Sequence, residues 1–144
     1  MATISRSALV MFSPAQMYDL VNDIAAYPQF LPWCVASKVL DVSEREISAM
    51  LDVRKGMLKY QFSTQNTLTP NAAIDMHLID GPFKHLEGHW KFDMIGDNQG
   101  CRVSLEMDFE FSNRLLSTSL GPIFSQITGS MVDAFCQRAQ AIYG

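Results

Sequence analysis

The sequence has few charged residues and no excess of positive charge. Charged residues make up 18% of its 144 residues and the formal net charge is −4, whereas soluble domains average about 25% charged residues. A nucleic-acid-binding face depends on clustered Lys and Arg, and here these residues are scattered along the chain. We therefore expect no DNA partner, and any contact with an anionic surface would depend on a local patch.

Cysteine is scarce and shows no metal-binding pattern. The three cysteines are Cys34, Cys101 and Cys136, which are widely spaced and form no CxxC pair. Their odd number and spacing argue against a disulfide framework or a zinc site. We expect buried or free reduced thiols and no metal.

Long hydrophobic runs are also missing. The apolar run near the N-terminus covers residues 8–12, which is too short for the h-region of a signal peptide and far too short for a membrane span. We expect a cytoplasmic protein that contacts the inner face of a membrane only peripherally.

The sequence contains no GxSxG, HExxH, Walker or GxGxxG motif. His85 and His89 share the outward face of a predicted strand and lack a clear third metal ligand. Glu106, Asp108 and Glu110 form a row on the solvent side of another strand. We therefore expect no enzymatic activity and no cofactor.

Period-2 alternation dominates the chain and predicts strands with one buried and one solvated face. The clearest case is residues 103–111, where apolar residues at odd positions alternate with Arg102, Ser104, Glu106, Asp108 and Glu110. The predicted strands are residues 3–12, 35–42, 46–54, 58–68, 74–78, 86–94 and 103–111. Short turns between them predict antiparallel neighbours.

Two segments have helical spacing instead. Ser13-Pro14 provides an N-cap and a first-turn proline for a short helix. Residues 113–143 carry a long apolar stripe, in which Gly121-Pro122 must kink or restart the helix. We therefore predict an α+β fold in which a curved antiparallel sheet of about seven strands wraps around a long C-terminal helix. Residues 1–144 are expected to form a single domain.

A sheet that wraps around a helix leaves a wedge that side chains either fill or leave open as a pocket. Gly88 lies on the inner face between Leu86 and Trp90, and nine methionines give an adaptable lining. The alternative is that Gly88 marks a bulge and the methionines simply pack. Arg6 falls on a mostly apolar face, where it would meet a polar head group inside a cavity, reflect a shift in strand register, or occupy a sheet edge.

Two further features have alternative interpretations. One predicted hairpin turn is flanked by three basic residues, Arg54, Lys55 and Lys59. They would form a solvated tip, or they would contact the phosphate groups of lipid or RNA. "AAYPQFLPWC", residues 25–34, is an apolar elbow that its prolines keep from forming a long helix. It would plug one end of the core, cover the mouth of a pocket, or dip into a membrane surface.

Five stretches of the sequence resemble one family. They are "ISRSALV", "MYDLVNDIAAYPQFLPWC", "DGPFKHLEGHWKF", "DFEFSNRLL" and "MVDAFCQRA". The chain is similar over nearly its whole length to the coenzyme Q-binding protein family. This is the branch of the START-like, polyketide cyclase/dehydrase superfamily that includes the bacterial ribosome association toxin RatA.

The resemblance implies a helix-grip fold with an apolar tunnel that accepts a lipid, expected to be ubiquinone or another isoprenoid quinone. By motif match, Tyr27, Pro28, Phe30, Leu31 and Pro32, together with Gly81, Pro82, Phe83, Leu86, Gly88 and Trp90, would lie at or near the tunnel. The full set of expected tunnel and gate residues is Tyr27, Phe30, Leu31, Pro32, Trp33, Tyr60, Phe62, Phe83, Leu86, Gly88, Trp90, Phe92, Phe109, Phe124, Ile127, Met131 and Phe135.

Two functions follow from the resemblance. The first is non-enzymatic quinone binding that supports respiration or quinone biosynthesis. The alternative is a RatA-like regulator that binds the large ribosomal subunit and blocks subunit association. The motifs do not separate these two. An enzyme is the third alternative, since relatives of this fold cyclise polyketides, and the lack of a convincing inward acid–base pair argues against it.

Overall fold

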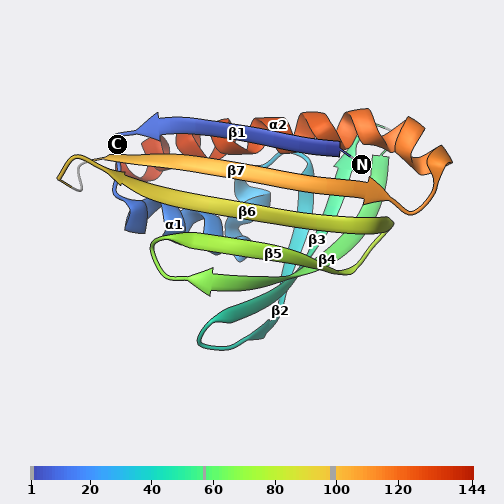
Figure 1. Ribbon diagram of the computed structural model, residues 1–144, viewed down its shortest axis with the longest axis horizontal. Helices are drawn as coiled ribbons and strands as arrows, with labels where there is room; N and C mark the ends of the chain where they lie inside the picture. The colour runs from blue at the N-terminus through green and yellow to red at the C-terminus, as the bar shows by residue number, and fades with distance from the viewer. Residues whose placement is uncertain (1, 57, 98–99) are drawn as a thin grey trace.

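The computed structural model of the protein describes residues 2–56, 58–97 and 100–144. Within these residues, seven strands form one sheet in the order β1-β7-β6-β5-β4-β3-β2, and every neighbouring pair is antiparallel. Figure 1 shows the sheet from its outward face, with the long helix α2 crossing behind β1 and β7. The predicted α+β helix-grip architecture is confirmed.

The strands follow the predicted alternation. Their bounds are β1 Ala2–Val10, β2 Cys34–Val42, β3 Glu46–Lys55, β4 Leu58–Thr69, β5 Ala73–Asp80, β6 Phe83–Ile95 and β7 Gly100–Phe111. In β7 the odd-numbered side chains from Cys101 to Phe111 are all buried. The inner faces of the strands therefore supply one wall of the core.

β1 and β2 are the two edges of the sheet. β2 is exposed along most of its length and its pairing with β3 shifts register twice. Arg6 lies on β1 opposite Leu105, and its guanidinium group packs over Gly129 of α2. The interpretation of Arg6 as an edge residue is thus confirmed.

Helix α1, Pro14–Asn22, begins as its sequence predicts. The backbone N–H of Gln16 donates to the Ser13 hydroxyl, and the N–H of Ser13 donates to the Gln16 side chain. This reciprocal capping box satisfies two N–H groups that a helix start leaves unpaired. The chain then forms the 3-10 helix η1, Ile24–Gln29, which contains Pro28 and makes the first half of the elbow.

The C-terminal helix α2, Arg114–Tyr143, has 30 residues and is therefore roughly 45 Å long. It continues through Pro122 as one helix rather than restarting there. Its buried stripe includes Phe124, Ile127, Met131 and Phe135, which face the sheet. None of the helices in the described part of the chain is both long and apolar enough to cross a membrane.

Candidate functional site

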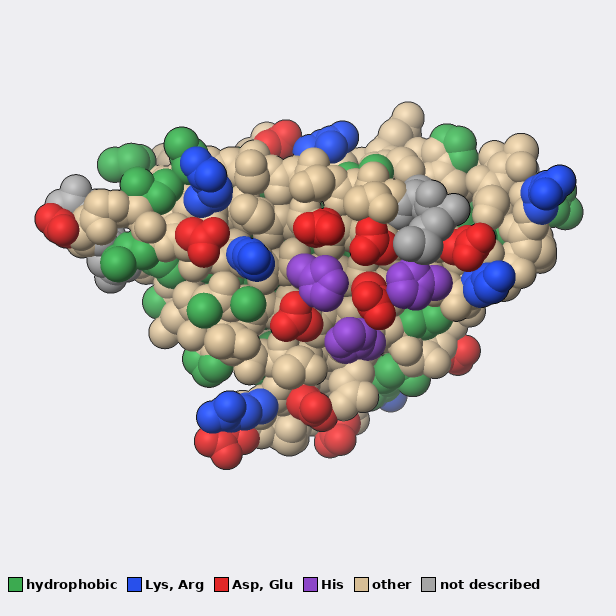
Figure 2. Space-filling model, in the orientation of Figure 1, with side chains coloured by type: hydrophobic (Ala, Val, Ile, Leu, Met, Phe, Trp, Pro, Cys, Tyr) green, Lys and Arg blue, Asp and Glu red, His purple; other side chains and the backbone are tan. Residues whose placement is uncertain are grey.

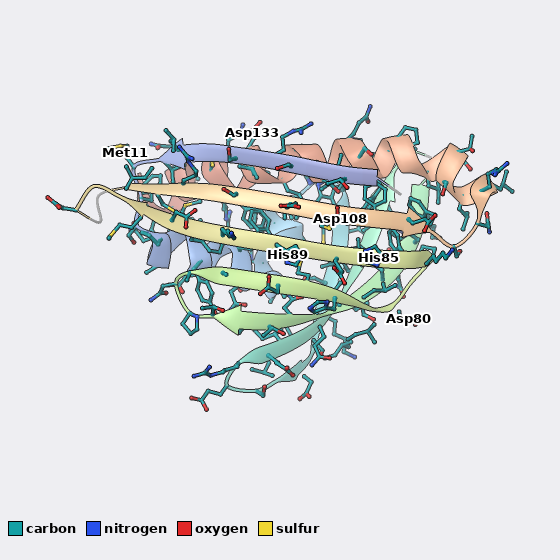
Figure 3. The ribbon with its side chains drawn as sticks, viewed as in Figure 1. Met11, Asp80, His85, His89, Asp108 and Asp133 are labelled. Carbon is teal, nitrogen blue, oxygen red and sulfur yellow. The ribbon has the colours of Figure 1, made fainter. Side chains whose placement is uncertain are left out.

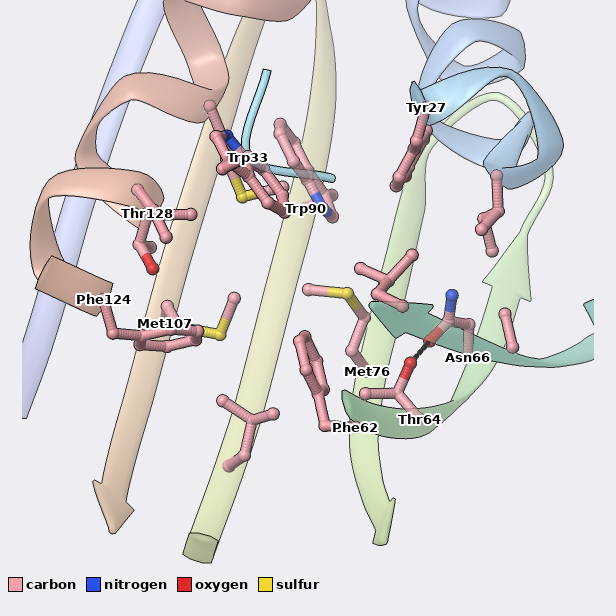
Figure 4. A pocket seen from close by; sticks show the side chains of 16 residues that line it. Tyr27, Trp33, Phe62, Thr64, Asn66, Met76, Trp90, Met107, Phe124 and Thr128 are labelled. Carbon is pink, nitrogen blue, oxygen red and sulfur yellow. Dashed lines mark hydrogen bonds between the residues drawn. The ribbon is translucent and has the colours of Figure 1, made fainter. Parts of the chain in front are cut away.

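A cavity of about 50 Å³ lies between the inner face of the sheet and α2. Figure 4 shows the side chains around it, with α2 on one side and β4 on the other. Its wall is formed by Ile24, Tyr27, Trp33, Ala49, Leu51, Phe62, Thr64, Asn66, Met76, Leu86, Trp90, Met107, Phe124, Ile127, Thr128 and Met131. The predicted wedge is therefore mostly filled, with a small space left between the sheet and α2.

The volume of this cavity limits what it holds without rearrangement. A cavity of ~150 Å³ lined by apolar side chains is known to bind benzene, and this one is about a third of that size. An isoprenoid tail or a quinone ring therefore enters only if side chains of the wall move. An open tunnel, as the resemblance implies, would require that movement.

Two methionines occupy the room that Gly88 provides. Gly88 pairs in regular register with Met76 of β5 and Met107 of β7, so the alternative of a bulge at this position is wrong. A Cβ on Gly88 would overlap the Cε of Met76 and lie 3.1 Å from the Sδ of Met107. Because methionine side chains are flexible, these two form the most easily displaced part of the wall.

An aromatic cluster fills the end of the wedge beside the cavity. Its members are Tyr60, Phe62, Phe83, Phe109, Phe111 and Phe124, with ring centroids 4.6 to 6.3 Å apart in the contacting pairs. Phe62 and Phe124 also reach the cavity wall. Such packed rings are stabilised beyond their buried area, so this end of the wedge resists opening.

The elbow both plugs the core and forms part of the cavity wall. Tyr27 and Trp33 are buried and line the cavity. Phe30 instead packs on Phe135 of α2 at 5.2 Å between ring centroids, and the Arg138 side chain lies over the outer face of Phe30. The elbow is thus attached to the C-terminal half of α2.

Several polar groups interrupt the apolar wall. The Thr64 hydroxyl donates to the Asn66 side-chain oxygen at 2.9 Å, and both residues are buried. Thr128 Oγ1 and Trp33 Nε1 have no hydrogen-bond partner among the described residues. Buried polar groups are usually paired, so these two atoms are available to a water molecule or a ligand in the cavity.

The structure brings about half of the predicted residues together. Those on the cavity wall are Tyr27, Trp33, Phe62, Leu86, Trp90, Phe124, Ile127 and Met131. The others lie behind the wall, in the aromatic cluster or at the surface: Phe30, Leu31, Pro32, Tyr60, Phe83, Gly88, Phe92, Phe109 and Phe135. A ligand-binding role for any of them stays a prediction.

Eight wall residues were not predicted as site residues, although their pattern contains a signal. Thr64 and Asn66 continue the inward face of Tyr60 and Phe62 on β4, and Thr128 follows Phe124 by one helical turn. Met76 and Met107 lie on inward faces of their strands opposite Gly88. The remaining three are Ile24, Ala49 and Leu51.

The three histidines lie on the outward face of the sheet, away from the cavity. Figures 2 and 3 show them among carboxylates of β5, β6 and β7. His89 Nδ1 is 2.7 Å from Asp75 Oδ1, and His77 Nδ1 is 3.8 Å from Glu87 Oε1. No group of three or more His, Cys, Asp or Glu within the described ranges is placed to hold a metal ion.

The turn between β3 and β4 carries an exposed basic tip. Arg54 and Lys59 are direct cross-strand partners, and Lys55 and Lys59 are both exposed. Asp52 lies 3.8 Å from Arg54, and the chain has no Asp or Glu from Val53 to Ile74. We call Arg54, Lys55 and Lys59 the basic hairpin tip.

The three cysteines are free, as expected. Burial raises the pKa of the Cys34 thiol to about 11 and that of Cys101 to about 11. Burial also raises the pKa of the Cys136 thiol. At neutral pH all three are therefore protonated and weakly nucleophilic.

Comparison with known proteins places the chain among bacterial and eukaryotic relatives. The family model described as polyketide cyclase / dehydrase and lipid transport matches residues 10–136. The chain is 47% identical to the "Ribosome association toxin RatA" of Pseudomonas aeruginosa, covering 98% of this chain and 97% of that protein. The protein of the same name from Vibrio cholerae is 48% identical over 100% of this chain and 99% of its own length.

More distant proteins match the chain in sequence or in structure. The "Coenzyme Q-binding protein COQ10 homolog B, mitochondrial" of Xenopus laevis is 33% identical over 97% of this chain and 59% of that protein. The 18 kDa protein CC1736 from Caulobacter crescentus superposes with a TM-score of 0.77 at 29% identity, covering 100% of this chain and 99% of that chain. The Zhui aromatase/cyclase from Streptomyces sp. R1128 reaches 0.86 at 14% identity over 96% and 93% of the two chains, which shows a shared fold.

Proposed function

This chain belongs to the polyketide cyclase / dehydrase and lipid transport family, and we propose that within this family it acts as a regulator that binds the large ribosomal subunit and blocks subunit association. The observation that carries the proposal is the 47–48% identity to proteins named ribosome association toxin over essentially the full length of both chains. The cytoplasm is where such a protein would meet its partner.

The basic hairpin tip is the surface best suited to contact ribosomal RNA. Lys55 and Lys59 are exposed and no acidic side chain follows them in β4. Local clusters of this kind neutralise phosphates and make binding depend on salt concentration. The outward sheet face, where carboxylates surround the histidines, would be repelled by RNA.

The test measures ribosome profiles on density gradients after the purified protein is added to separated subunits. We expect the wild type to increase free subunits at the expense of joined ribosomes. Lys55→Gln/Lys59→Gln should weaken binding to the large subunit and reduce its salt slope by about 2, one for each lost phosphate contact. Lys38→Gln/Lys91→Gln removes two exposed lysines from other strands and is the matched control.

A wild type that leaves the subunits free to join would overturn the proposed function. A hairpin variant as active as the wild type would overturn only the choice of docking surface. The proposed function would stand, because it is argued from identity to the relatives over the whole chain and not from the hairpin.

We also propose that the cavity binds a neutral hydrophobic ligand, with an isoprenoid quinone such as ubiquinone as the expected molecule. The specific observation is an apolar cavity with unpaired polar atoms in its wall, and the relative named for coenzyme Q binding supports it. Burying a few hundred Å² of tail would contribute several kcal/mol at about 25 cal/mol per Å². A peripheral contact with a membrane surface would supply such a ligand.

Neither proposed function is catalytic. Tyr27 is the one titratable side chain among the described residues that line the cavity. Its hydroxyl donates to the Val21 carbonyl, and burial holds its pKa far above the ordinary value. A wall with no second acid or base lacks the pair that general acid–base chemistry uses.

Ligand binding is tested by organic extraction of the purified protein and mass spectrometry beside a mock purification. Enrichment of a quinone or another polyprenyl lipid near one per chain is the expected result. Extracts that stay empty even after incubation with quinone-loaded vesicles would contradict the proposal.

A further inference from the structure

Three hydrogen-bond donors from separate parts of the chain lie around the cavity. They are the Asn66 amide on β4, the Thr128 hydroxyl on α2 and the Trp33 indole N–H next to the elbow. The exposed fractions of the three side chains are 5%, 1% and 6%. Each is therefore largely shielded from bulk water and belongs to a residue of the cavity wall.

The Asn66 amide is oriented by its neighbour. The Thr64 hydroxyl donates to the Asn66 oxygen at 2.9 Å, which occupies the acceptor side of the amide. Figure 4 shows the amide nitrogen directed away from Thr64. The N–H groups of Asn66 therefore remain as donors at the cavity wall.

Thr128 and Trp33 lack the partners that such groups normally find. A threonine inside a helix commonly bonds a carbonyl three or four residues earlier, and a buried tryptophan N–H usually has an acceptor. Neither Thr128 Oγ1 nor Trp33 Nε1 has a partner among the described residues. Each atom is thus available to an acceptor that enters the cavity within its reach.

The wall contains donors but no charge. No Lys, Arg, Asp, Glu or His is among the described residues that line the cavity. A carboxylate or phosphate buried there would lack a counter-charge, which is strongly unfavourable. A neutral carbonyl group accepts hydrogen bonds from donors without that penalty.

We propose that Asn66, Thr128 and Trp33 form a head-group subsite that binds the carbonyl oxygens of a neutral amphiphile, such as a quinone ring, and discriminates against fatty acids and plain hydrocarbons. The proposal rests on the hydrophobic-ligand function proposed above and names the residues that would give it specificity. The ring enters as the ends of Met76 and Met107 move from their position over Gly88.

The experiment uses the two tryptophans of the chain, Trp33 and Trp90, which both line the cavity and therefore report on its occupancy. A short-chain ubiquinone is titrated in while quenching of the tryptophan fluorescence is recorded. The affinities of oleate and of an isoprenoid hydrocarbon of equal tail length are then measured by their displacement of that quinone. The wild type should bind the quinone more tightly than either competitor.

Thr128→Val removes one donor while keeping the shape of the side chain, and Asn66→Leu removes another. Each should weaken quinone binding about threefold to tenfold and leave the affinity for the hydrocarbon unchanged. Thr118→Val, an exposed position on the same helix, is the matched control. Thermal melts of every variant verify folding, and Thr128→Val tests the proposal even if Asn66→Leu fails to fold.

The outcomes distinguish failure of the head-group subsite from failure of the proposed hydrophobic-ligand function. A folded Thr128→Val protein with wild-type quinone affinity, or a wild type that prefers oleate, overturns the subsite and leaves hydrophobic binding in place. A wild type that binds neither quinone nor hydrocarbon overturns both.

Discussion

The guanidinium carbon of Arg138 lies 4.9 Å from the centroid of the Phe30 ring, and its Nη2 donates to the Gln29 side chain at 2.8 Å. Phe30 in turn packs on Phe135, which lies three residues before Arg138 on α2. The C-terminal half of α2 therefore holds the elbow in place through two side chains, Phe135 and Arg138.

Arg138→Ala should loosen the elbow without unfolding the protein. It removes a cation–π contact and a charge-assisted hydrogen bond at a half-exposed site, worth about 1 kcal/mol together. We expect a loss of that size in the free energy of unfolding and faster hydrogen exchange in residues 24–33. Gln137→Ala, at the exposed neighbouring position, should leave both quantities unchanged. Equal exchange rates in the two variants would contradict the role given to Arg138.

Gly88→Ala should destabilise the protein through a single neighbour. The new Cβ would overlap the end of the Met76 side chain, and crowding of a packed core typically costs ~1–3 kcal/mol. Shortening that neighbour, as in Met76→Val, should recover part of the loss, so a double-mutant cycle should give a favourable coupling energy. Additive effects in chemical unfolding would show that the two residues do not compete for this space.

The buried thiols predict a loss of stability in alkali. Their ordinary pKa is 9.0, and burial raises those of Cys34 and Cys101 to about 11. Above pH 9 the unfolded chain loses thiol protons that the folded chain retains, so the free energy of unfolding decreases as pH rises from 9 toward 11. Burial raises the pKa of Tyr27 and Tyr60 as well, which acts in the same direction.

Urea midpoints between pH 8 and 10.5 measure this slope. Cys34→Ala/Cys101→Ala should flatten it, whereas the tyrosines keep part of it. A midpoint independent of pH over this range would disagree with the burial of these groups.

Ala49→Leu should separate the two proposed functions. Ala49 is buried in the cavity wall, so a larger side chain occupies the ligand space while the basic hairpin tip is unchanged. We expect lost binding of short-chain ubiquinone and retained inhibition of subunit association. Ala36→Leu, an exposed alanine on β2, is the control for added apolar bulk. Loss of both activities in a folded Ala49→Leu protein would instead indicate that ligand and ribosome binding are coupled.

The sheet was predictable because alternation marks each strand independently of its neighbours. Val103 through Phe111 alternate so regularly that the buried face of β7 follows from the sequence alone. The start of α1 was equally clear, because Ser13 and Pro14 each favour one position at a helix start. The continuity of α2 across Pro122 was not, because tertiary packing decides whether such a helix kinks or restarts.

The cavity was only partly predictable. An apolar residue on an inward face either fills space or borders it, and the choice depends on side-chain conformation. Phe83 stacks on Phe111 within the aromatic cluster, whereas Phe124, which Phe109 meets edge-on, also reaches the cavity. Thr64 and Asn66 were overlooked because polar residues are seldom expected on an inner face, although their positions in the alternation place them there. The sequence motifs did not separate quinone binding from ribosome binding. The comparisons favour ribosome binding, since the relatives at 47–48% identity are named ribosome association toxin.

The pairing of the first strand with the last has a consequence for synthesis. β1 finds its partner only when β7 has been made, and α2, which completes the cavity wall, follows β7 in the chain. Contacts between such distant segments form late and slow folding. A nascent chain therefore has neither the full sheet nor the cavity wall until β7 and α2 have left the exit tunnel. If the proposed ribosome binding requires the finished fold, a chain still in synthesis cannot inhibit the ribosome that makes it.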